Sequence, residues 1–455
     1  MRETLKSTLL CYKDKRLLFV FLFGVASGFP WVMIGSALSA WLQETGLSRS
    51  SIGLFGSITI AYSINFFWSP LLDRIKPPVL GQRRGWIVTS QFMIVFACLG
   101  MALIPVENNL LIIGLVGFSI AVFSATQDIA VDAYRIDIIK PYEKDKLAAA
   151  SSMATAGWWT GFGGLGAIPF FIADLPNWQW SEIYLVLAAM MAGLMLMVFF
   201  SDEPITDRLA QQSAASVKYA KQWVGDKSMN SLERAVNWLL VTLIEPFRDF
   251  FSRNTFKIAI SILLFIFLFK IGEAFLGRMS IVFYKELGFT NSDIGSYSKL
   301  LNWWVTIVFA VLGGMVNIRY GIYRGLMTGG IAMAASNLMF ALMSVVGPNK
   351  ALFAAAIFVD GFTAAWSSVA LVAFISLLCN QAFSASQYAL MASLGTLSRT
   401  MMASASGFIV DWMNGNWAAF FILTAVMVIP SLVLLYFIKD HIAELEQRYH
   451  PAPPS

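Results

Sequence analysis

The chain has 455 residues, of which 58% are hydrophobic and only 13% are charged. Its mean hydropathy is +0.68, and apolar stretches long enough to cross a bilayer recur along it. A soluble core cannot hide that much apolar surface, so this composition excludes a soluble globular domain and predicts an all-α integral membrane protein. In such a protein the net charge of +5 reflects orientation and not an affinity for nucleic acid.

The few cysteines and histidines exclude several kinds of chemistry. Cys11, Cys98 and Cys379 show no spacing typical of a disulfide framework or a metal site. Both histidines, His441 and His450, lie in the C-terminal tail, so neither belongs to a zinc-protease motif or to a proton relay inside the membrane. No nucleophile–base pair or cofactor loop stands out. We therefore expect neither an enzyme nor a bound metal or cofactor.

Apolar segments predict about twelve membrane spans. They lie at 17–42, 52–72, 86–104, 110–138, 148–173, 183–200, 256–283, 291–316, 325–346, 351–376, 387–412 and 417–438. A long polar segment after the sixth span predicts an N-terminal six-helix half (1–200), a cytoplasmic linker (201–255), a C-terminal six-helix half (256–438) and a cytoplasmic tail (439–455). Within the linker, the apolar stripe of Asn230–Phe251 predicts an amphipathic helix at the membrane interface.

The basic residues between spans indicate orientation. Of these, 25 lie on the side that holds the N-terminus and three, Arg49, Lys285 and Lys350, on the other. Because cytoplasmic loops are enriched in Lys and Arg, both termini are predicted to be cytoplasmic.

The two halves repeat each other, since residues 41–53 align with residues 283–295 at an offset of 242. Two pseudo-symmetric six-span halves joined by a linker resemble the major facilitator superfamily, in which the first, fourth, seventh and tenth spans line a central cavity. The interiors of the third, sixth, ninth and twelfth spans carry no charge. Charges instead occupy the fourth span (Asp128, Asp132, Arg135), the seventh (Lys270, Glu273, Arg278), the tenth (Asp360), the eighth (Lys299) and the eleventh (Arg399).

The fourth span carries the most pronounced polar stripe. Asp128, Asp132 and Arg135 are spaced i, i+4, i+7 and share one helical face, while Asp137 falls on the opposite side. A charge at the centre of a transmembrane helix costs about 2.5–3.5 kcal/mol on insertion scales, so such residues face a protein interior or a water-filled path. The stripe is therefore a candidate proton-coupling and gating element. The alternative is a salt-bridge network that only holds the span to its neighbours.

Three further motifs have both a functional and a structural interpretation. Asp73-Arg74, followed by Gln82-Arg-Arg-Gly85, resembles the cytoplasmic gate motif of the superfamily, although basic anchoring at the membrane also explains it. Lys270 and Glu273 are spaced i, i+3 and are able simply to pair. The glycines of 161–166 fit a nucleotide-binding pattern, but they lie inside a span with no preceding strand and favour close helix packing.

The chain is similar to the AmpG family of muropeptide permeases over nearly its whole length. The motifs that carry the resemblance include Asp73-Arg74 with Gly81–Trp86, Gln127-Asp-Ile-Ala130, Lys270-Ile-Gly-Glu-Ala-Phe275, Ser298-Lys299, Phe383–Leu390 and Arg399. The resemblance implies a bacterial inner-membrane transporter that imports GlcNAc-anhydroMurNAc peptides from periplasm to cytoplasm. It also implies proton symport with alternating access, with the proton gradient in place of any cofactor.

Two departures from the family lie in the expected cavity. Trp158-Trp159 stand where the family carries a Tyr-Arg pair, and Arg278 is an addition. Related permeases import siderophores, so a siderophore or another acidic solute is the alternative substrate. A transporter-like signalling protein is a third, weaker possibility.

The expected ligand is an acidic, amphiphilic small molecule, because mid-membrane cations bind carboxylates strongly where the dielectric is low. The expected substrate contacts are Gln127, Lys270, Arg278, Lys299, Arg399, Trp158 and Trp159. The expected proton-coupling and gating residues are Asp128, Asp132, Arg135, Glu273, Asp360, Asp73 and Arg74. We expect a monomer surrounded by lipid.

Overall fold

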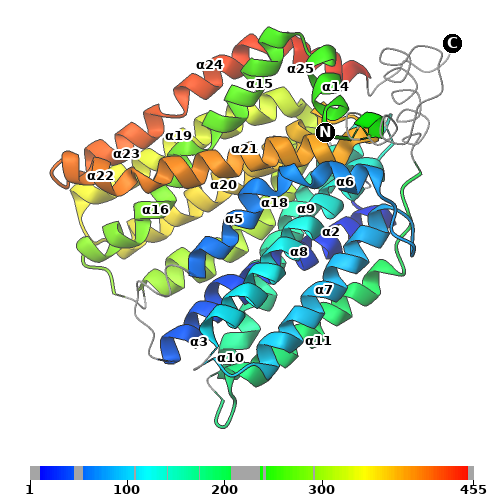
Figure 1. Cartoon of the computed structure of the whole chain (residues 1–455). Coiled ribbons are helices and arrows are strands. Elements are labelled where there is room, and N and C mark those ends of the chain that lie inside the picture. Colours follow the sequence, from blue (N-terminus) through cyan, green and yellow to red (C-terminus); the bar gives the residue numbers. More distant parts are fainter. Residues whose placement is uncertain are drawn as a thin grey trace.

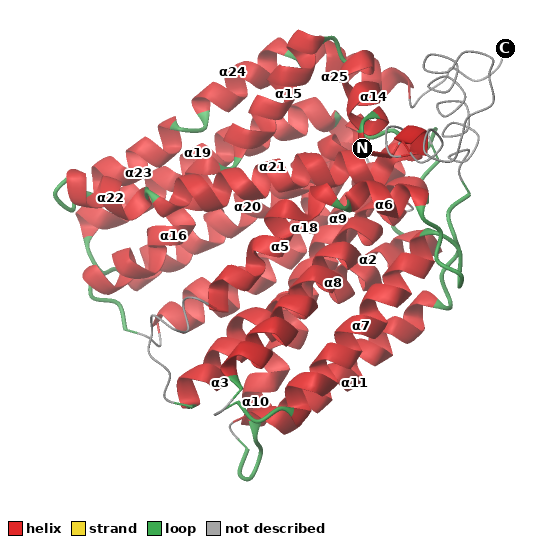
Figure 2. Cartoon of the chain, in the orientation of Figure 1, coloured by secondary structure: helices red, strands yellow, loops and turns green. Residues whose placement is uncertain are grey.

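The computed structural model describes residues 11–45, 55–106, 109–140, 142–173, 175–205, 236–238, 242–290 and 293–448. Every regular element in these residues is helical (Figure 2). Within the same ranges, nine helices are long and apolar enough to cross a membrane, so the chain is a multi-pass membrane protein. These are Lys15–Leu42, Arg83–Leu103, Leu110–Asp137, Trp180–Val198, Phe256–Glu286, Ser296–Tyr320, Ile322–Val346, Lys350–Leu378 and Trp417–Phe437.

The remaining three predicted spans, the second, fifth and eleventh, are helical but interrupted. The second consists of η2 (Gly56–Thr59), α5 (Ile60–Ile64), η3 (Asn65–Phe67) and α6 (Ser69–Arg74). The fifth consists of α9 (Lys144–Trp159), η4 (Thr160–Gly164), η5 (Leu165–Ala167) and α10 (Ile168–Ala173). The eleventh consists of α21 (Ser384–Ser404) and α22 (Ser406–Trp412). Glycines in the fifth span and Pro70 at the start of α6 account for two of these interruptions.

The helices form two groups that lie side by side, shown blue to green and green to red in Figure 1. The first group, called here the N-half, also contains α2 (Lys15–Gly28), η1 (Val32–Ala37), α3 (Leu38–Glu44), α7 (Arg83–Leu103), α8 (Leu110–Asp137) and α11 (Trp180–Val198). The second, the C-half, also contains α15 (Phe256–Phe269), α16 (Ile271–Glu286), η6 (Ile294–Leu301), α18 (Asn302–Tyr320), α19 (Ile322–Val346), α20 (Lys350–Leu378), η7 (Gln381–Phe383), α23 (Trp417–Val426), α24 (Ile429–Phe437) and α25 (Lys439–Arg448).

The two halves share their largest hydrophobic core on one side of the molecule. The side where α2 begins and α8 ends, called here the terminal face, holds one core shared by both halves, with Tyr134 and Phe374 among its members. Toward the opposite, distal face each half has a core of its own, around Leu187 in the N-half and Phe421 in the C-half. The halves are therefore joined by a large core at the terminal face. Beyond it they also touch between η4 and α18, where a Cβ at Gly163 would lie 2.5 Å from the Trp303 ring.

Close helix contacts fix the wall of the N-half that faces the C-half. α2 and α9 approach so closely that a Cβ at Gly157 would lie 2.2 Å from the Phe21 carbonyl oxygen. A Cβ at Gly28 would lie 2.1 Å from the carbonyl oxygen of Trp158. Backbone contact of this kind requires glycine on both helices. It holds Trp158 in one orientation beside α2.

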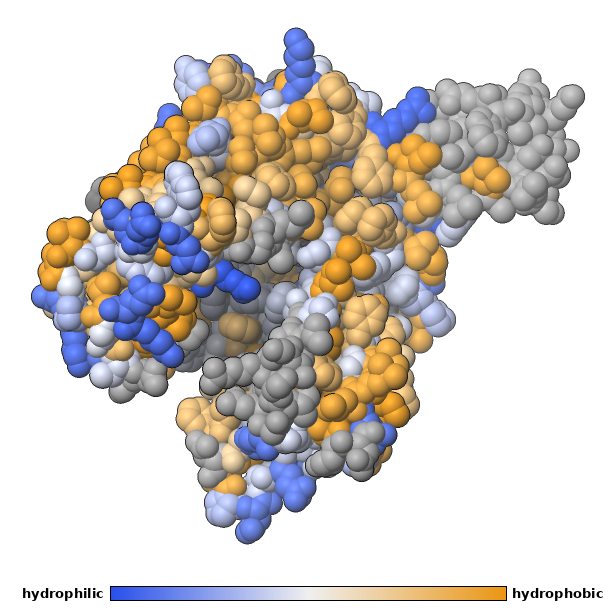
Figure 3. Space-filling model, turned by 60° about the vertical axis from the view of Figure 1, so that its left-hand side comes forward, coloured by the Kyte–Doolittle hydropathy of each residue, from blue (hydrophilic) through white to orange (hydrophobic). Residues whose placement is uncertain are grey.

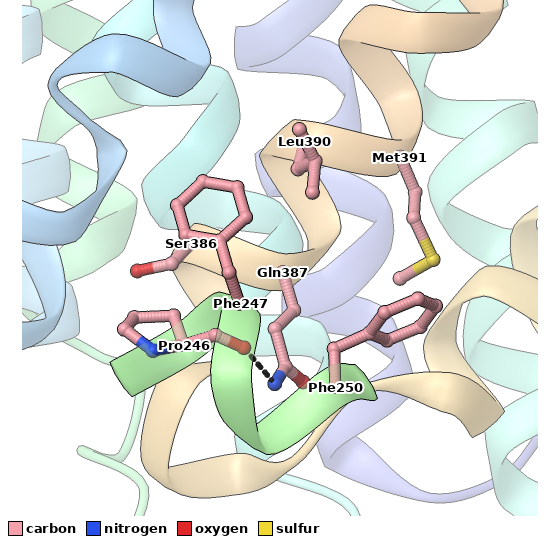
Figure 4. Close-up of a pocket in the computed structure, with 7 residues that line it drawn as sticks. All are labelled: Pro246, Phe247, Phe250, Ser386, Gln387, Leu390 and Met391. Atoms are coloured by element: carbon pink, nitrogen blue, oxygen red, sulfur yellow. Dashed lines mark hydrogen bonds between the residues drawn. The ribbon is translucent and has the colours of Figure 1, made fainter. Parts of the chain in front are cut away.

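The linker contributes one described helix, α14 (Glu245–Arg253), which packs on α21. Figure 4 shows the small pocket between them, with Phe250 beside Met391 and with Gln387 pointing toward the linker. The Gln387 amide donates to the Pro246 carbonyl oxygen at 2.9 Å. Of the predicted interfacial helix, Asn230–Phe251, residues 230–235 and 239–241 lie outside the described residues, and nearly all the others are helical. Its interfacial position and the four domain boundaries stay predictions.

Candidate functional site

A cavity of about 410 Å³ lies between the two halves. Its walls come from α2, α5, η3, α8 and α9 of the N-half and from α16, α20 and α21 of the C-half. Figure 3 shows that the face away from the termini is hollowed at its centre. The volume is that of a small-molecule site. Since the core shared by the two halves lies toward the terminal face and the hollow lies on the other, the cavity opens at the distal face.

Aromatic rings line the N-half side of the cavity. The ring centroids of Trp31 and Tyr62 are 4.2 Å apart, and those of Trp31 and Trp158 are 6.4 Å apart. Trp158 also stacks on Phe162 at 5.1 Å and meets Trp159 edge-on at 5.3 Å. Trp158 and Trp159 thus lie in the cavity wall, where a ring face is available to a sugar or another flat apolar surface.

Two carboxylates of α8 lie in the same N-half wall. Asp128 accepts a hydrogen bond from the Ser27 hydroxyl at 2.6 Å. Asp132 forms an ion pair with Arg135 at 2.9 Å. Arg135 is completely buried, and it also donates to Ser376 of the C-half at 2.6 Å. The stripe therefore faces the cavity at Asp128 and Asp132, and at Arg135 it contacts the other half.

The C-half wall is polar and carries a charge of each sign. Glu273 of α16 and Arg399 of α21 both line the cavity. Arg399 is exposed, and among the described residues its Nε donates a single long bond, of 3.4 Å, to the Gly395 carbonyl oxygen. No ion pair joins Arg399 to any residue that the structure describes. Its guanidinium is therefore open to an anionic ligand from the cavity.

Four other predicted site residues, Gln127, Asp360, Arg278 and Lys270, do not line this cavity. Gln127 is fully buried, and its amide nitrogen donates to the Ala26 carbonyl oxygen at 2.7 Å. Asp360 accepts from Ser336 at 3.2 Å on the far side of α20. Arg278 is exposed on α16 away from the lining, and the side chain of Lys299 lies outside the described residues. Lys270 is buried behind Glu273.

The terminal face is closed by a buried charge network that spans both halves. Asp73 accepts from the backbone N–H groups of Ala385 at 3.3 Å and Ser386 at 2.8 Å, and so caps the start of α21. The Arg83 guanidinium, which is completely buried, bonds Asp73 at 2.6 Å and Asp137 at 2.7 Å. These contacts hold α21 of the C-half against α6, α7 and α8 of the N-half.

Two members of this network were not among the individual gating residues expected from sequence: Arg83, which was predicted only as part of the Gln82-Arg-Arg-Gly85 motif, and Asp137. Arg83 also donates to the Ser384 hydroxyl at 2.8 Å, and that hydroxyl donates to Asp137 at 2.8 Å. Arg74, which was expected, is half-buried and forms no ion pair with the described residues. The sequence signal for Arg83 was its place in the gate motif just before the predicted span 86–104. Only the structure shows that α7 begins at Arg83 and that its guanidinium is buried beside acidic partners.

The Major Facilitator Superfamily model matches residues 20–300 of the chain. Among solved structures, the proton:xylose symporter XylE superposes with a TM-score of 0.67 at 13% identity, covering 94% of this chain and 95% of that one. The Escherichia coli fucose:proton symporter FucP superposes with a TM-score of 0.63 at 14% identity, covering 93% of this chain and 99% of that one. Fold and cavity define a transporter of this class, not an enzyme.

Curated relatives narrow the class further. A Rickettsia felis protein named as an AmpG transporter is 31% identical over 434 residues, which cover 95% of this chain and 98% of the relative. The anhydromuropeptide permease of Escherichia coli K12 is 30% identical over 426 residues, which cover 93% of this chain and 80% of the relative. The chain therefore belongs to the AmpG family of the major facilitator superfamily, as its motifs predicted.

Proposed function

We propose that the chain imports peptidoglycan-derived anhydromuropeptides from periplasm to cytoplasm across a bacterial inner membrane. The observation that supports this best is a cavity with two unlike walls. Trp158 and Trp159 offer ring faces on one side, and Arg399 offers an unpaired guanidinium on the other. An anhydromuropeptide has sugar rings at one end and peptide carboxylates at the other. The permease of Escherichia coli, named for such substrates, supports the assignment.

Transport proceeds in this proposal by alternating access driven by a proton gradient, with no cofactor. The distal opening is the periplasmic one, and the Asp73–Arg83–Asp137 network is the closed cytoplasmic gate. Both termini are then cytoplasmic, as the basic residues predict. Proton coupling requires a carboxylate in the water path whose environment changes as the gate opens. Asp128, bonded to the Ser27 hydroxyl, meets that requirement in the N-half.

Uptake of a labelled anhydromuropeptide into proteoliposomes with an imposed pH gradient tests this function. We expect the wild-type chain to concentrate the label and Asp128→Asn to lose concentrative uptake while it elutes as a folded monomer. Wild-type accumulation by that variant removes Asp128 from the mechanism. A ferric siderophore is the competitor: if it is accumulated and the muropeptide is not, the alternative acidic substrate replaces this proposal.

A further inference from the structure

Lys270 interrupts the seventh span in the middle of the membrane. α15 ends at Phe269 and α16 begins at Ile271, so Lys270 occupies the break between two helices. Its side chain is almost completely buried, and its ammonium donates to the Ser367 hydroxyl at 2.8 Å and to the Ala364 carbonyl oxygen at 3.3 Å. The third donor bonds the carboxylate of Glu273. All three donors of the ammonium are used, and only one acceptor carries a charge.

Glu273 separates Lys270 from the cavity. The Glu273 side chain is 27% exposed and lines the cavity, whereas that of Lys270 is 5% exposed and does not. Ser367 and Ala364 of α20 close the other sides of the ammonium. An anion that enters from the cavity therefore reaches Lys270 only at the place now taken by the Glu273 carboxylate.

The backbone around the break is held on both sides. A Cβ at Gly272 would lie 2.3 Å from the Thr424 carbonyl oxygen, so α16 begins in direct backbone contact with α23. On the other side, the Ser398 hydroxyl of α21 donates to the Phe267 carbonyl oxygen near the end of α15. Lys270 is thus fixed in place. The group that moves at this site is therefore the side chain of Glu273.

Few other charges act on the pair. Arg399 of α21 and Asp360 of α20 are the remaining charged groups near Lys270. α23 has no ionisable residue, and those of α19, α22 and α24 lie at the helix ends. A buried ammonium needs one anion close by, and the loss of that anion leaves an uncompensated charge. Glu273 supplies that anion while the cavity is empty.

We propose that Glu273 is an exchangeable counterion of Lys270: it takes up a proton and swings away as a carboxylate of the substrate takes its place. The inference rests on the proposed import of an acidic muropeptide. One proton and one carboxylate enter together, so the net charge around Lys270 stays constant. Binding of each favours binding of the other by the same factor, which is the thermodynamic basis of symport. One proton is carried per carboxylate bound at Lys270.

Substrate counterflow in proteoliposomes tests the exchange, because it needs no pH gradient. For the wild type, we expect the Km of a muropeptide to rise with pH, by up to about tenfold per pH unit, because one proton enters with each carboxylate. In Glu273→Gln, which is permanently neutral, counterflow should persist with a Km that changes less than about twofold between about pH 6 and about pH 8. Glu273→Asp should restore the pH dependence. Asp411→Asn, which alters an exposed carboxylate at the end of α22, should keep the wild-type profile.

A double variant separates the ligand from the proton. Lys270→Gln with Glu273→Gln removes the ion pair without leaving a lone charge. Because Arg399 is still able to bind a carboxylate, this variant should keep part of the preference for the muropeptide over its carboxyl-amidated form, and that preference should be at least about fivefold weaker than in the wild type. The wild type should prefer the acid form at about pH 6 by at least about tenfold. A pH-dependent Km in folded, active Glu273→Gln, or an unchanged acid preference in the double variant, overturns the proposal. Absence of muropeptide counterflow by the wild type instead overturns the proposed function.

Discussion

The cavity and the gate on the terminal face use the same residue types in opposite ways. In the gate, one guanidinium, that of Arg83, lies between Asp73 and Asp137 with all three side chains buried. In the cavity, Arg399 has no charged partner among the described residues, and Asp128 is bonded to a hydroxyl and not to a cation. The charged groups of the gate are bonded to partners from both halves, whereas Arg399 and Asp128 in the cavity are available to a ligand.

This difference shows which charges stabilise one conformation and which are available to bind the substrate. Removing one partner of a buried ion pair is strongly destabilising because it leaves an uncompensated charge. An exposed, unpaired cation contributes little to folding and is available for binding. Variants of the gate should therefore change the conformation of the protein, and variants of the cavity should change its affinity for substrate.

The largest expected effect is that of Arg83→Ala. Loss of the guanidinium leaves Asp73 and Asp137 close together and uncompensated, which should cost about 3–5 kcal/mol of the stability of the closed conformation. The thiol of Cys379, buried at the end of α20 near the gate, is a native reporter. In a Cys11→Ser background, we expect Arg83→Ala to raise the rate at which a hydrophilic maleimide labels Cys379 and to lower the unfolding temperature in detergent.

Arg74→Ala is the matched control, because Arg74 is only half-buried and has no ion pair with the described residues. It should change stability by no more than about 0.5 kcal/mol and leave Cys379 protected. Equal labelling of both variants would contradict the assignment of the gate to Arg83.

Next in size is the effect of Arg399→Ala on substrate affinity. A hydrogen bond to a charged group is worth about 1.5–3 kcal/mol, so the apparent Km for a peptide-bearing muropeptide should rise by about 10–100-fold. The Km of the carboxyl-amidated ligand should rise by less than about threefold. Competition uptake measures both. Arg278→Ala, on the same half but away from the lining, is the control. Equal losses for both ligands would show that Arg399 does not meet a carboxylate.

Hydropathy and repeat patterns predicted the fold well, because a span needs only length and apolar composition. They also predicted that Asp128 and Asp132 face the interior. The hydrogen-bonding and ion-pair partners of individual residues could not be predicted in the same way. Asp137 lies on the side of α8 opposite Asp128, and its partners Arg83 and Ser384 are 54 and 247 residues away. Only the packed bundle brings them together.

Residues that look alike in sequence also differ in what surrounds them. Gln127 is a polar residue in an apolar span beside Asp128, which suggests a ligand contact. Its amide instead bonds the Ala26 carbonyl oxygen and helps to join α8 to α2. Lys270, expected as a direct substrate contact, is covered by Glu273. Periodicity indicates which helical face a side chain occupies. It does not indicate whether a neighbouring residue already bonds that side chain.

A smaller effect is expected where the linker helix supports the gate. Gln387 of α21 donates to Asp249 of α14 at 2.8 Å and accepts from Arg253 at 3.0 Å. Gln387→Ala removes these two hydrogen bonds to charged groups, so it should cost about 1–3 kcal/mol and raise Cys379 labelling less than Arg83→Ala does. Ser252→Ala, on the exposed side of α14, is the control. Unchanged labelling in Gln387→Ala would show that the gate does not depend on the linker.

The smallest effect concerns a charge cluster on the terminal face that lies within one half. Arg16 of α2 bonds both carboxylate oxygens of Glu143 at 2.8 Å. These hydrogen bonds, followed by one from Lys146, lower the pKa of Glu143 from 4.5 to about 2. Because the folded-state pKa is the lower one, the contribution to stability is complete above about pH 4.5, falls as the pH decreases, and is lost below about pH 2.

Glu143→Gln should therefore lower the unfolding temperature slightly at neutral pH, by the equivalent of no more than about 1 kcal/mol, since the cluster is partly exposed. The difference from wild type should shrink as the pH is lowered from about 5 toward about 3. Cys379 should stay protected throughout, because Arg16 and Glu143 both belong to the N-half. Increased labelling at neutral pH would mean that a pair within one half also holds the gate. The contrast between the gate and the remaining charges of the terminal face would then fail.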